Sequence, residues 1–197
     1  KIKLFDPSWL VRVTYPIAAP FFTPIGGLFL VGILIAAIVS GALSWQVLVQ
    51  SADQTLLSQS TLFYLALAYP VMKGLHELSH CYALYRFDGQ VREFGVMFLL
   101  FFPIPYVEAS EATALPDKRA RMLVGAAGII AELFLASVAL LLWLQIEPGV
   151  ERALLFNFVL IGSISTLLFN GNPLLKFDAY FVLADWLEMP NLAQRSG

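Results

Sequence analysis

Four long apolar stretches run through the sequence, and they restrict the possible folds more than any other feature. A helix needs roughly 20 predominantly apolar residues to cross the hydrocarbon core of a bilayer, which is about 30 Å thick. Of all residues, 59% are hydrophobic and 13% are charged, whereas soluble domains are charged at roughly a quarter of their positions. The composition therefore indicates a membrane-embedded protein. We expect spans at about 25–43, 62–85, 122–144 and 153–187, the last with a break near 170–173.

The chain lacks internal repeats and low-complexity linkers, so we expect residues 1–197 to form a single membrane-embedded domain. The first residue is Lys1 and the end, "AQRSG", is abrupt, which we interpret as a piece of a longer protein. The segment "DPSWLVRVTYP" predicts a short interfacial helix before the first span. A net charge of -2 gives no electrostatic reason to expect nucleic acid as a partner. The single cysteine, Cys81, excludes an internal disulfide.

Basic residues are distributed unevenly between the connections. The stretch 44–61 contains no Lys or Arg, whereas the N-terminal segment and the connection at 86–121 are both basic. The positive-inside rule then places the N-terminus, the 86–121 connection and the C-terminus in the cytoplasm.

The segment "FGVMFLLFFPIPY", residues 94–106, is uncharged but too short to span a bilayer. Its Phe and Val content and its "PIP" ending favour strands, so we expect a β-hairpin or re-entrant strand pair at about 90–107. Such backbone persists at membrane depth only when it is buried in protein or faces water; a hairpin on the membrane surface is the alternative. We also expect the strand near "GVMFLL" to hold an extended peptide by edge pairing. The predicted fold class is an all-α polytopic membrane protein with about four transmembrane helices and this short hairpin between spans two and three.

The only two histidines, His76 and His80, lie in "HELSH" within the second expected span. On a helix, residues four apart project from one face, so both rings can bind one zinc ion. Glu77 lies beside them, where it can act as the general base of a metalloprotease. Ionisable residues are costly inside a span and therefore indicate function. The alternative is a pair of interfacial histidines with a snorkelling glutamate at a helix end.

A catalytic zinc site needs a third protein ligand. Cys81 points about 100° round the helix from His80, so it is better interpreted as a packed thiol. Asp178 stands out among the carboxylates because "NGNPLLKFDAY" interrupts the fourth span, and an interrupted span marks a site. At 1.5 Å per residue, both the histidines and the break lie roughly 21–27 Å into their spans, in the same cytoplasmic layer. The carboxylates considered are Asp88, Glu108, Glu132, Asp178 and Asp185.

The combination of "HELSH" and, two spans later, "NGNPLLKFDAYFVLADWLEMPNL" resembles the site-2 protease family of intramembrane zinc metalloproteases. The likeness covers roughly residues 62–195 and is closest to the bacterial branch of peptide zinc metalloproteases. It implies one Zn²⁺ per chain, held by His76, His80 and Asp178, with Glu77 as the catalytic acid/base. It also implies that Asn172 lies close to the substrate backbone.

We expect Asn170 to contribute to substrate binding with Asn172. Glu132, in the middle of the third span, has two interpretations: it holds a histidine ring from behind, or it pairs with Lys73 or Lys176 and fixes the packing.

The function implied by the resemblance is hydrolysis of a peptide bond in or near a transmembrane segment or a membrane-associated peptide. The implied location is the bacterial inner (cytoplasmic) membrane, with secretion-adaptor-like domains or partners outside this segment. The family motif has glycine after the aspartate, where this chain has Ala179. This departure keeps a second hypothesis open, that of a non-proteolytic membrane partner of a peptide maturation or export system with a relic zinc site. A di-iron enzyme is excluded because two histidines cannot ligate two irons in the required manner.

Overall fold

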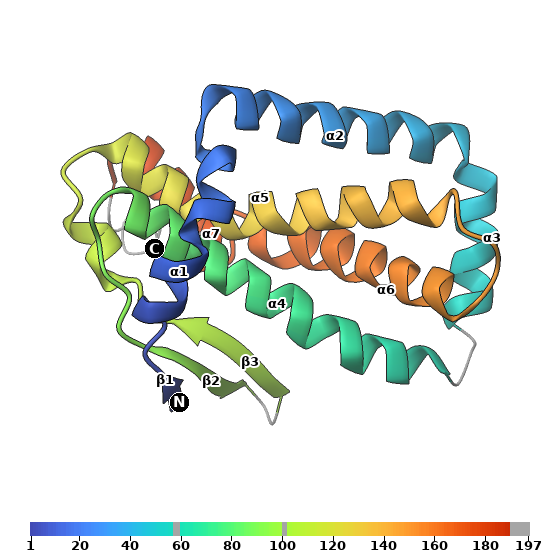
Figure 1. Cartoon of the computed structure of the whole chain (residues 1–197), viewed down its shortest axis with the longest axis horizontal. Coiled ribbons are helices and arrows are strands. Elements are labelled where there is room, and N and C mark those ends of the chain that lie inside the picture. Colours follow the sequence, from blue (N-terminus) through green and yellow to red (C-terminus); the bar gives the residue numbers. More distant parts are fainter. Residues whose placement is uncertain (57–59, 100–101, 190–197) are drawn as a thin grey trace.

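The computed structural model describes residues 1–56, 60–99 and 102–189, which form a helical bundle with a small sheet at one end (Figure 1). Three of the elements are short turns, of which η1 and η2 are 3-10 helices and η3 is a π-helix. In chain order the elements are β1 (Ile2–Phe5), α1 (Ser8–Ala18), η1 (Ala19–Phe22), α2 (Pro24–Leu43), α3 (Trp45–Leu56), α4 (Ser60–Arg86), β2 (Phe94–Leu99), β3 (Phe102–Val107), η2 (Ser110–Ala114), α5 (Lys118–Trp143), α6 (Val150–Ser165), η3 (Thr166–Asn170) and α7 (Asp178–Trp186).

Three helices in the described part of the chain are long and apolar enough to cross a membrane. They are α2, α5 and the continuous unit of α6 and η3, which has 21 residues. These helices correspond to the first, third and fourth predicted spans. The second predicted span lies in α4, which is long enough at 27 residues but is less apolar, because it carries Lys73, Glu77 and both histidines.

The break predicted in the fourth span is present. The helical backbone ends at Asn170 and resumes at Asp178, so the segment is a spanning-length helix followed by a separate short helix rather than one span that reaches residue 187. Pro173 cannot donate a backbone hydrogen bond and disfavours the helical conformation at the residue before it, which explains why the helix does not continue.

Local caps fix where several helices begin. Thr23 Oγ1 accepts a hydrogen bond from the backbone N–H of Gly26 at 3.0 Å, and Pro24 occupies the first turn of α2. The Asp117 carboxylate likewise accepts from the N–H of Arg119 at 3.0 Å at the start of α5. At the predicted interfacial helix, now α1, Asp6 accepts from the N–H of Ser8 at 2.8 Å.

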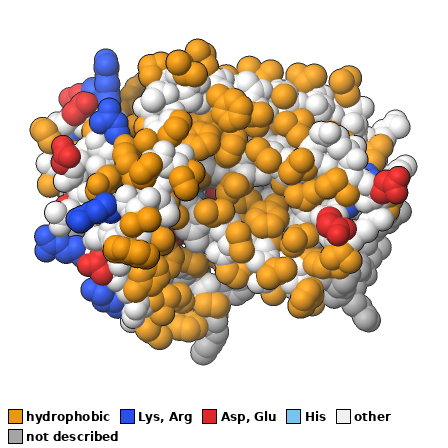
Figure 2. Space-filling model, in the orientation of Figure 1, with side chains coloured by type: hydrophobic (Ala, Val, Ile, Leu, Met, Phe, Trp, Pro, Cys, Tyr) orange, Lys and Arg blue, Asp and Glu red, His pale blue; other side chains and the backbone are white. Residues whose placement is uncertain are grey.

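Helix α5 is the centre of the bundle and packs against α2, α4, α6 and α7 (Figure 1). The stretch at 44–61 is not a simple connection, because residues 45–56 form the helix α3, which crosses the far end of the bundle. Figure 2 shows hydrophobic side chains over the middle of the molecule and most Lys and Arg side chains at the end that carries α1 and the sheet.

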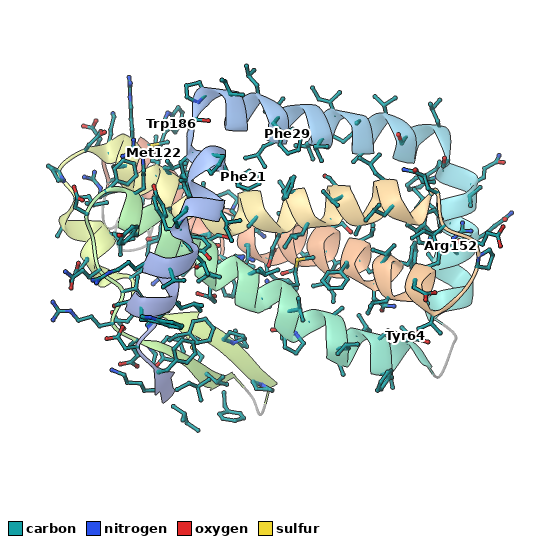
Figure 3. All side chains as sticks on the ribbon, viewed as in Figure 1. Phe21, Phe29, Tyr64, Met122, Arg152 and Trp186 are labelled. Carbon is teal, nitrogen blue, oxygen red and sulfur yellow. The ribbon has the colours of Figure 1, made fainter. Side chains whose placement is uncertain are left out.

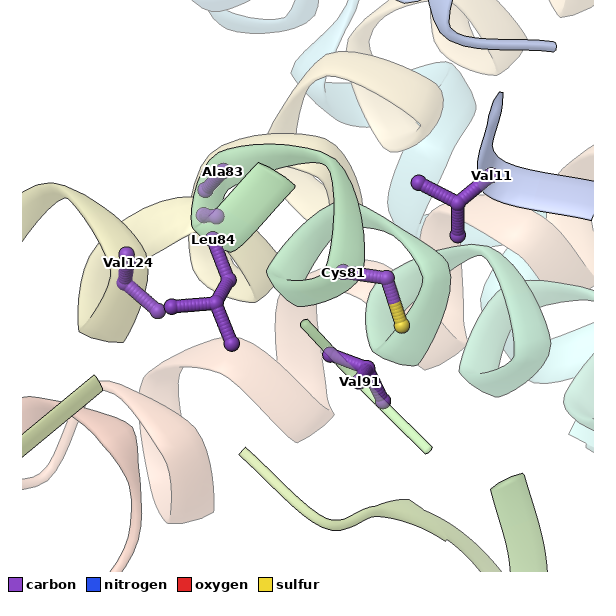
Figure 4. Close-up of a cluster of buried hydrophobic side chains, with 7 residues drawn as sticks. Val11, Cys81, Ala83, Leu84, Val91 and Val124 are labelled. Atoms are coloured by element: carbon purple, nitrogen blue, oxygen red, sulfur yellow. The ribbon is translucent and has the colours of Figure 1, made fainter. Parts of the chain in front are cut away.

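Two groups of apolar side chains join neighbouring elements of the fold. Phe21 of η1 and Phe29 of α2 lie close together (Figure 3), and both rings contact Phe134 of α5 with centroid distances of 5.5 and 6.2 Å. A second cluster contains Cys81, whose thiol is buried and packed (Figure 4), as the sequence predicts. Its members are Val11, Cys81, Ala83, Leu84, Val91, Val124 and Ala127.

The predicted hairpin is present, but it belongs to a three-stranded antiparallel sheet in the order β1-β2-β3. The first residues of the chain supply the third strand, with Ile2 opposite Val96 and Lys3 opposite Gly95. Because β2 is the central strand, the side of β2 that faces β1 is occupied as far as Val96, and the predicted pairing of a peptide near "GVMFLL" stays a prediction for the residues beyond it. Only its end beyond Val96 has no partner on the β1 side among the described residues.

The sheet has two edge strands, β1 and β3, and β3 is the one that contacts α4. On the side away from β2, β3 has no free N–H. The N–H of Glu108 donates inward to the carbonyl of Glu93 at 3.0 Å. The backbone N–H and C=O groups of successive strand residues point to alternate sides, so those of residues 103, 105 and 107 point away from β2. Pro103 and Pro105 have no N–H, and the N–H of Val107 donates to Oε2 of Glu77 at 3.1 Å.

Candidate metal centre

Two helices bring together three side chains of types that can bind a metal ion. His76 and His80 project from the same face of α4, and their Nε2 atoms are 3.2 Å apart. Asp178 is the first residue of α7, and its Oδ2 lies 3.0 Å from Nε2 of His76 and 3.5 Å from Nε2 of His80. Among the described residues, this is the group of His, Cys, Asp and Glu side chains that could hold a metal ion. The helix break thus places Asp178 against a motif about 100 residues earlier in the chain.

These distances fit a zinc ion. Tetrahedral zinc with bonds of about 2.0–2.2 Å requires ligand atoms roughly 3.3 Å apart. The separations of 3.0, 3.2 and 3.5 Å surround this value. Moreover, Oδ2 of Asp178 is buried without a regular hydrogen-bond partner, which is costly unless a cation satisfies it. The donor set of two imidazoles and one carboxylate is typical of a catalytic zinc site.

In each histidine, Nδ1, the ring nitrogen that points away from the ligand group, also lies near an oxygen atom. Nδ1 of His80 lies 2.7 Å from the carbonyl of Val124 on α5. A carbonyl only accepts, so Nδ1 carries the proton and Nε2 keeps its lone pair for a metal. Nδ1 of His76 lies 3.1 Å from Oε1 of Glu132, although the ring is not aligned for a regular hydrogen bond. Both rings therefore present Nε2 to the same point.

One face of α5 shapes the site, through residues that the sequence did not single out. A Cβ at Gly128 would lie 2.4 Å from Cε1 of His76 and 2.6 Å from Nε2 of His80, so only glycine lets the rings approach the helix. A Cβ at Gly125 would lie 3.1 Å from Cγ2 of Val182 on α7. The spacing of residues 125, 128 and 132, which share one helical face, is the signal that could have identified these glycines.

An ion pair fixes the far end of α7 against α5. Nε of Arg121 lies 2.6 Å from Oδ1 of Asp185, and Nη1 of the same arginine donates to the carbonyl of Leu115 at 2.8 Å. Lys118 forms a second, exposed ion pair with Glu188. These contacts hold the helix that begins with Asp178, so Asp185 has a structural role and does not join the ligand group.

Glu77 lies on α4 next to the ligands and is half-buried at the edge of the sheet. Its Oε2 accepts the hydrogen bond from the N–H of Val107. The carboxylate is therefore held between the histidine face of α4 and β3, with its other oxygen not fixed by this bond. Glu77 is thus adjacent in sequence to the ligand group and held in place by the sheet.

The remaining candidate residues lie apart from the ligand atoms. Asn170 is buried and donates from Nδ2 to Oε2 of Glu132 at 3.2 Å. Asn172 is half-buried, and its Oδ1 accepts from the N–H of Leu174 at 3.0 Å, which shapes the turn before α7. A role for either residue in substrate binding stays a prediction. Asp88 and Glu108 are exposed and outside the ligand group.

The position after Asp178 does not need glycine. Ala179 lies within α7, and the non-glycine residues with positive φ among those described are Asp88 and Glu188. Alanine is a good helix former, so the departure from the family motif is compatible with this backbone.

Comparisons with protein-family models, with curated proteins and with solved structures found no match to the chain.

Proposed function

We propose that the chain is an intramembrane zinc metalloprotease of the site-2 type. One observation carries the proposal: two histidines from α4 and an aspartate from α7 converge within 3.5 Å of one another, and Glu77 lies beside them. The reaction is hydrolysis of a peptide bond in or near a transmembrane segment or a membrane-associated peptide.

Each residue has a distinct role in this reaction. His76, His80 and Asp178 would hold zinc, which would supply a Lewis acid for the peptide carbonyl and lower the pKa of water. Glu77 accepts the proton of the attacking water and passes it to the leaving amine. The N–H of Val107 holds one carboxylate oxygen of Glu77 and leaves the other to carry the proton.

We propose that α4 is a fourth membrane span in spite of its charged residues. Its polar side chains face the bundle, because Lys73, His76 and His80 are all buried. The opposite surface of α4 is apolar and exposed, as expected for a lipid-facing helix. The exposed residues on α4 include Leu62, Phe63, Leu67, Val71 and Leu75.

The proposed orientation places the connection between α4 and α5 in the cytoplasm and the turn between α5 and α6 outside. We expect a cysteine at Glu147, in that turn, to react with a membrane-impermeant maleimide in intact cells. A cysteine at Ala114 should react only after permeabilisation. Both positions are exposed, and Cys81→Ala provides a background without the native thiol. Labelling in the reverse order would overturn the orientation, and equal labelling of both positions would overturn the span in α5, the helix that separates them.

Metal analysis of the purified protein tests the site directly. We expect about one zinc per wild-type chain and less than a tenth of that in His76→Ala and Asp178→Ala, because each change removes one of three ligands. Asp88→Asn is the matched control, since this aspartate is exposed and lies outside the ligand group. Zinc retained in Asp178→Ala would show that the third ligand lies elsewhere.

A further inference from the structure

A buried polar cluster lies directly behind the proposed metal centre. Its middle is Glu132, which is completely buried in α5. Oε1 of Glu132 lies 2.5 Å from Nζ of Lys73 on α4 and 3.1 Å from Nδ1 of His76. Oε2 accepts from Oγ1 of Thr166 at 2.8 Å and from Nδ2 of Asn170 at 3.2 Å. The Lys73 ammonium also donates to Oγ of Ser165 at 2.5 Å.

The two oxygens of this carboxylate connect different parts of the fold. Oε1 faces α4, where it meets Lys73 and a proposed zinc ligand. Oε2 faces η3, the π-helical turn at the end of the long helix. Thr166 and Asn170 are the first and last residues of this turn, and π-helical turns often occur at functional sites. The segment that follows η3 leads to Asp178, the other half of the ligand group.

A buried cluster of charged and polar side chains costs desolvation free energy that apolar packing between helices does not. A buried ion pair is often no more stabilising than apolar side chains of similar volume, because both charges must be desolvated. Packing alone therefore does not explain why the chain puts a lysine and a glutamate here. A carboxylate behind a metal-binding imidazole, in contrast, fixes the orientation of the ring and its tautomer.

We propose that Glu132 and Lys73 are positioning residues that connect the two halves of the metal centre. Glu132 holds the His76 ring from behind with Oε1 and holds the turn that leads to Asp178 with Oε2. Lys73 balances the charge of Glu132 and ties it to Ser165. Neither residue touches the substrate. This inference rests on the proposed function, because it concerns ligands of the same metal.

The test compares two double variants that both remove the buried charges. Lys73→Met with Glu132→Gln keeps a hydrogen-bond acceptor behind His76, whereas Lys73→Met with Glu132→Leu removes it. Cobalt(II) is the probe: its affinity for the metal-free protein and its visible absorption spectrum both report on the ligand geometry. We expect the Leu variant to lose about 10–100-fold in affinity, the usual effect of losing such a partner, with a changed spectrum. The Gln variant should stay close to wild type.

Equal affinity and identical spectra in wild type and in the Leu variant would overturn this inference while leaving the metal site in place. Failure of the wild type to bind cobalt or zinc would overturn the proposed function and this inference with it. Thr166→Val keeps every charge and removes one hydrogen bond to Oε2 of Glu132. This variant replaces the Leu variant in the test if the Leu variant does not fold. It should bind cobalt more weakly than Ser163→Ala, whose hydroxyl bonds only within its own helix; equal binding by these two variants would overturn the inference.

Discussion

Glu77→Gln is expected to abolish peptide cleavage and to leave the zinc content of the protein unchanged. The glutamine carbonyl can still accept the hydrogen bond from Val107, so the local structure persists. The amide cannot take a proton from water, however, and loss of a general base typically costs about 10²–10⁴-fold in rate. The measurement combines metal analysis with cleavage of membrane-spanning fluorogenic peptides that the wild-type protein hydrolyses.

Glu108→Gln is the matched control, because this glutamate is exposed and lies next to Val107 outside the ligand group. Cleavage at the wild-type rate in Glu77→Gln would remove this glutamate from the reaction. The hypothesis of a non-proteolytic partner makes a different prediction, which is that neither variant differs from the wild type in any measurable activity.

Gly128→Ala is expected to prevent stoichiometric zinc binding although the substituted residue has no ligand atom. The added methyl group would lie 2.4 Å from Cε1 of His76 and 2.6 Å from Nε2 of His80, well inside van der Waals contact. The rings cannot simply move aside, because Val124 holds His80 at Nδ1. Overpacking of this kind typically costs about 1–3 kcal/mol, and here the strain falls on the ligands themselves. Metal analysis and thermal unfolding would be measured together.

Gly74→Ala provides the comparison within α4, since a Cβ there meets no atom within 4 Å. Alanine is favoured over glycine in a helix by roughly 1 kcal/mol, so this variant should bind zinc normally and unfold at the same or a higher temperature. Full zinc occupancy in Gly128→Ala would mean that the histidine rings have room that the structure does not give them.

The parts that the sequence predicted correctly depend on local patterns. Apolar length is enough to place α2 and α5, and the turn residues around Pro173 are enough to place the break before α7. The four-residue spacing of His76 and His80 fixes their common face as soon as the segment is helical. Counting residues across a bilayer placed the break before Asp178 in the same layer as the histidines, the resemblance implied Asp178 as the third ligand, and the structure brings the three side chains together.

The parts that the sequence missed depend on contacts between distant segments. β1 pairs with a strand about 90 residues away, and nothing in "IKLF" alone indicates its partner. Gly128 has meaning only once two rings from another helix approach it. Glu132 was left open between a ring partner and a lysine partner; in the structure its Oε1 lies near both His76 and Lys73, because both side chains project from α4 toward the same oxygen. Tertiary packing decides each of these contacts, and the residue pattern within a single helix or strand does not reveal them.

The β3 edge of the sheet has a consequence for aggregation. Reciprocal pairing between strands needs each strand both to donate and to accept hydrogen bonds. The outward side of β3 has carbonyls but no N–H to offer, because two positions are proline and the Val107 amide is bound to Glu77. A strand from a second molecule would therefore find hydrogen-bond acceptors on this side of β3 but no donors. The same backbone that holds Glu77 in place thus also protects an apolar strand from adding further copies of itself, a hazard that exposed sheet edges otherwise carry.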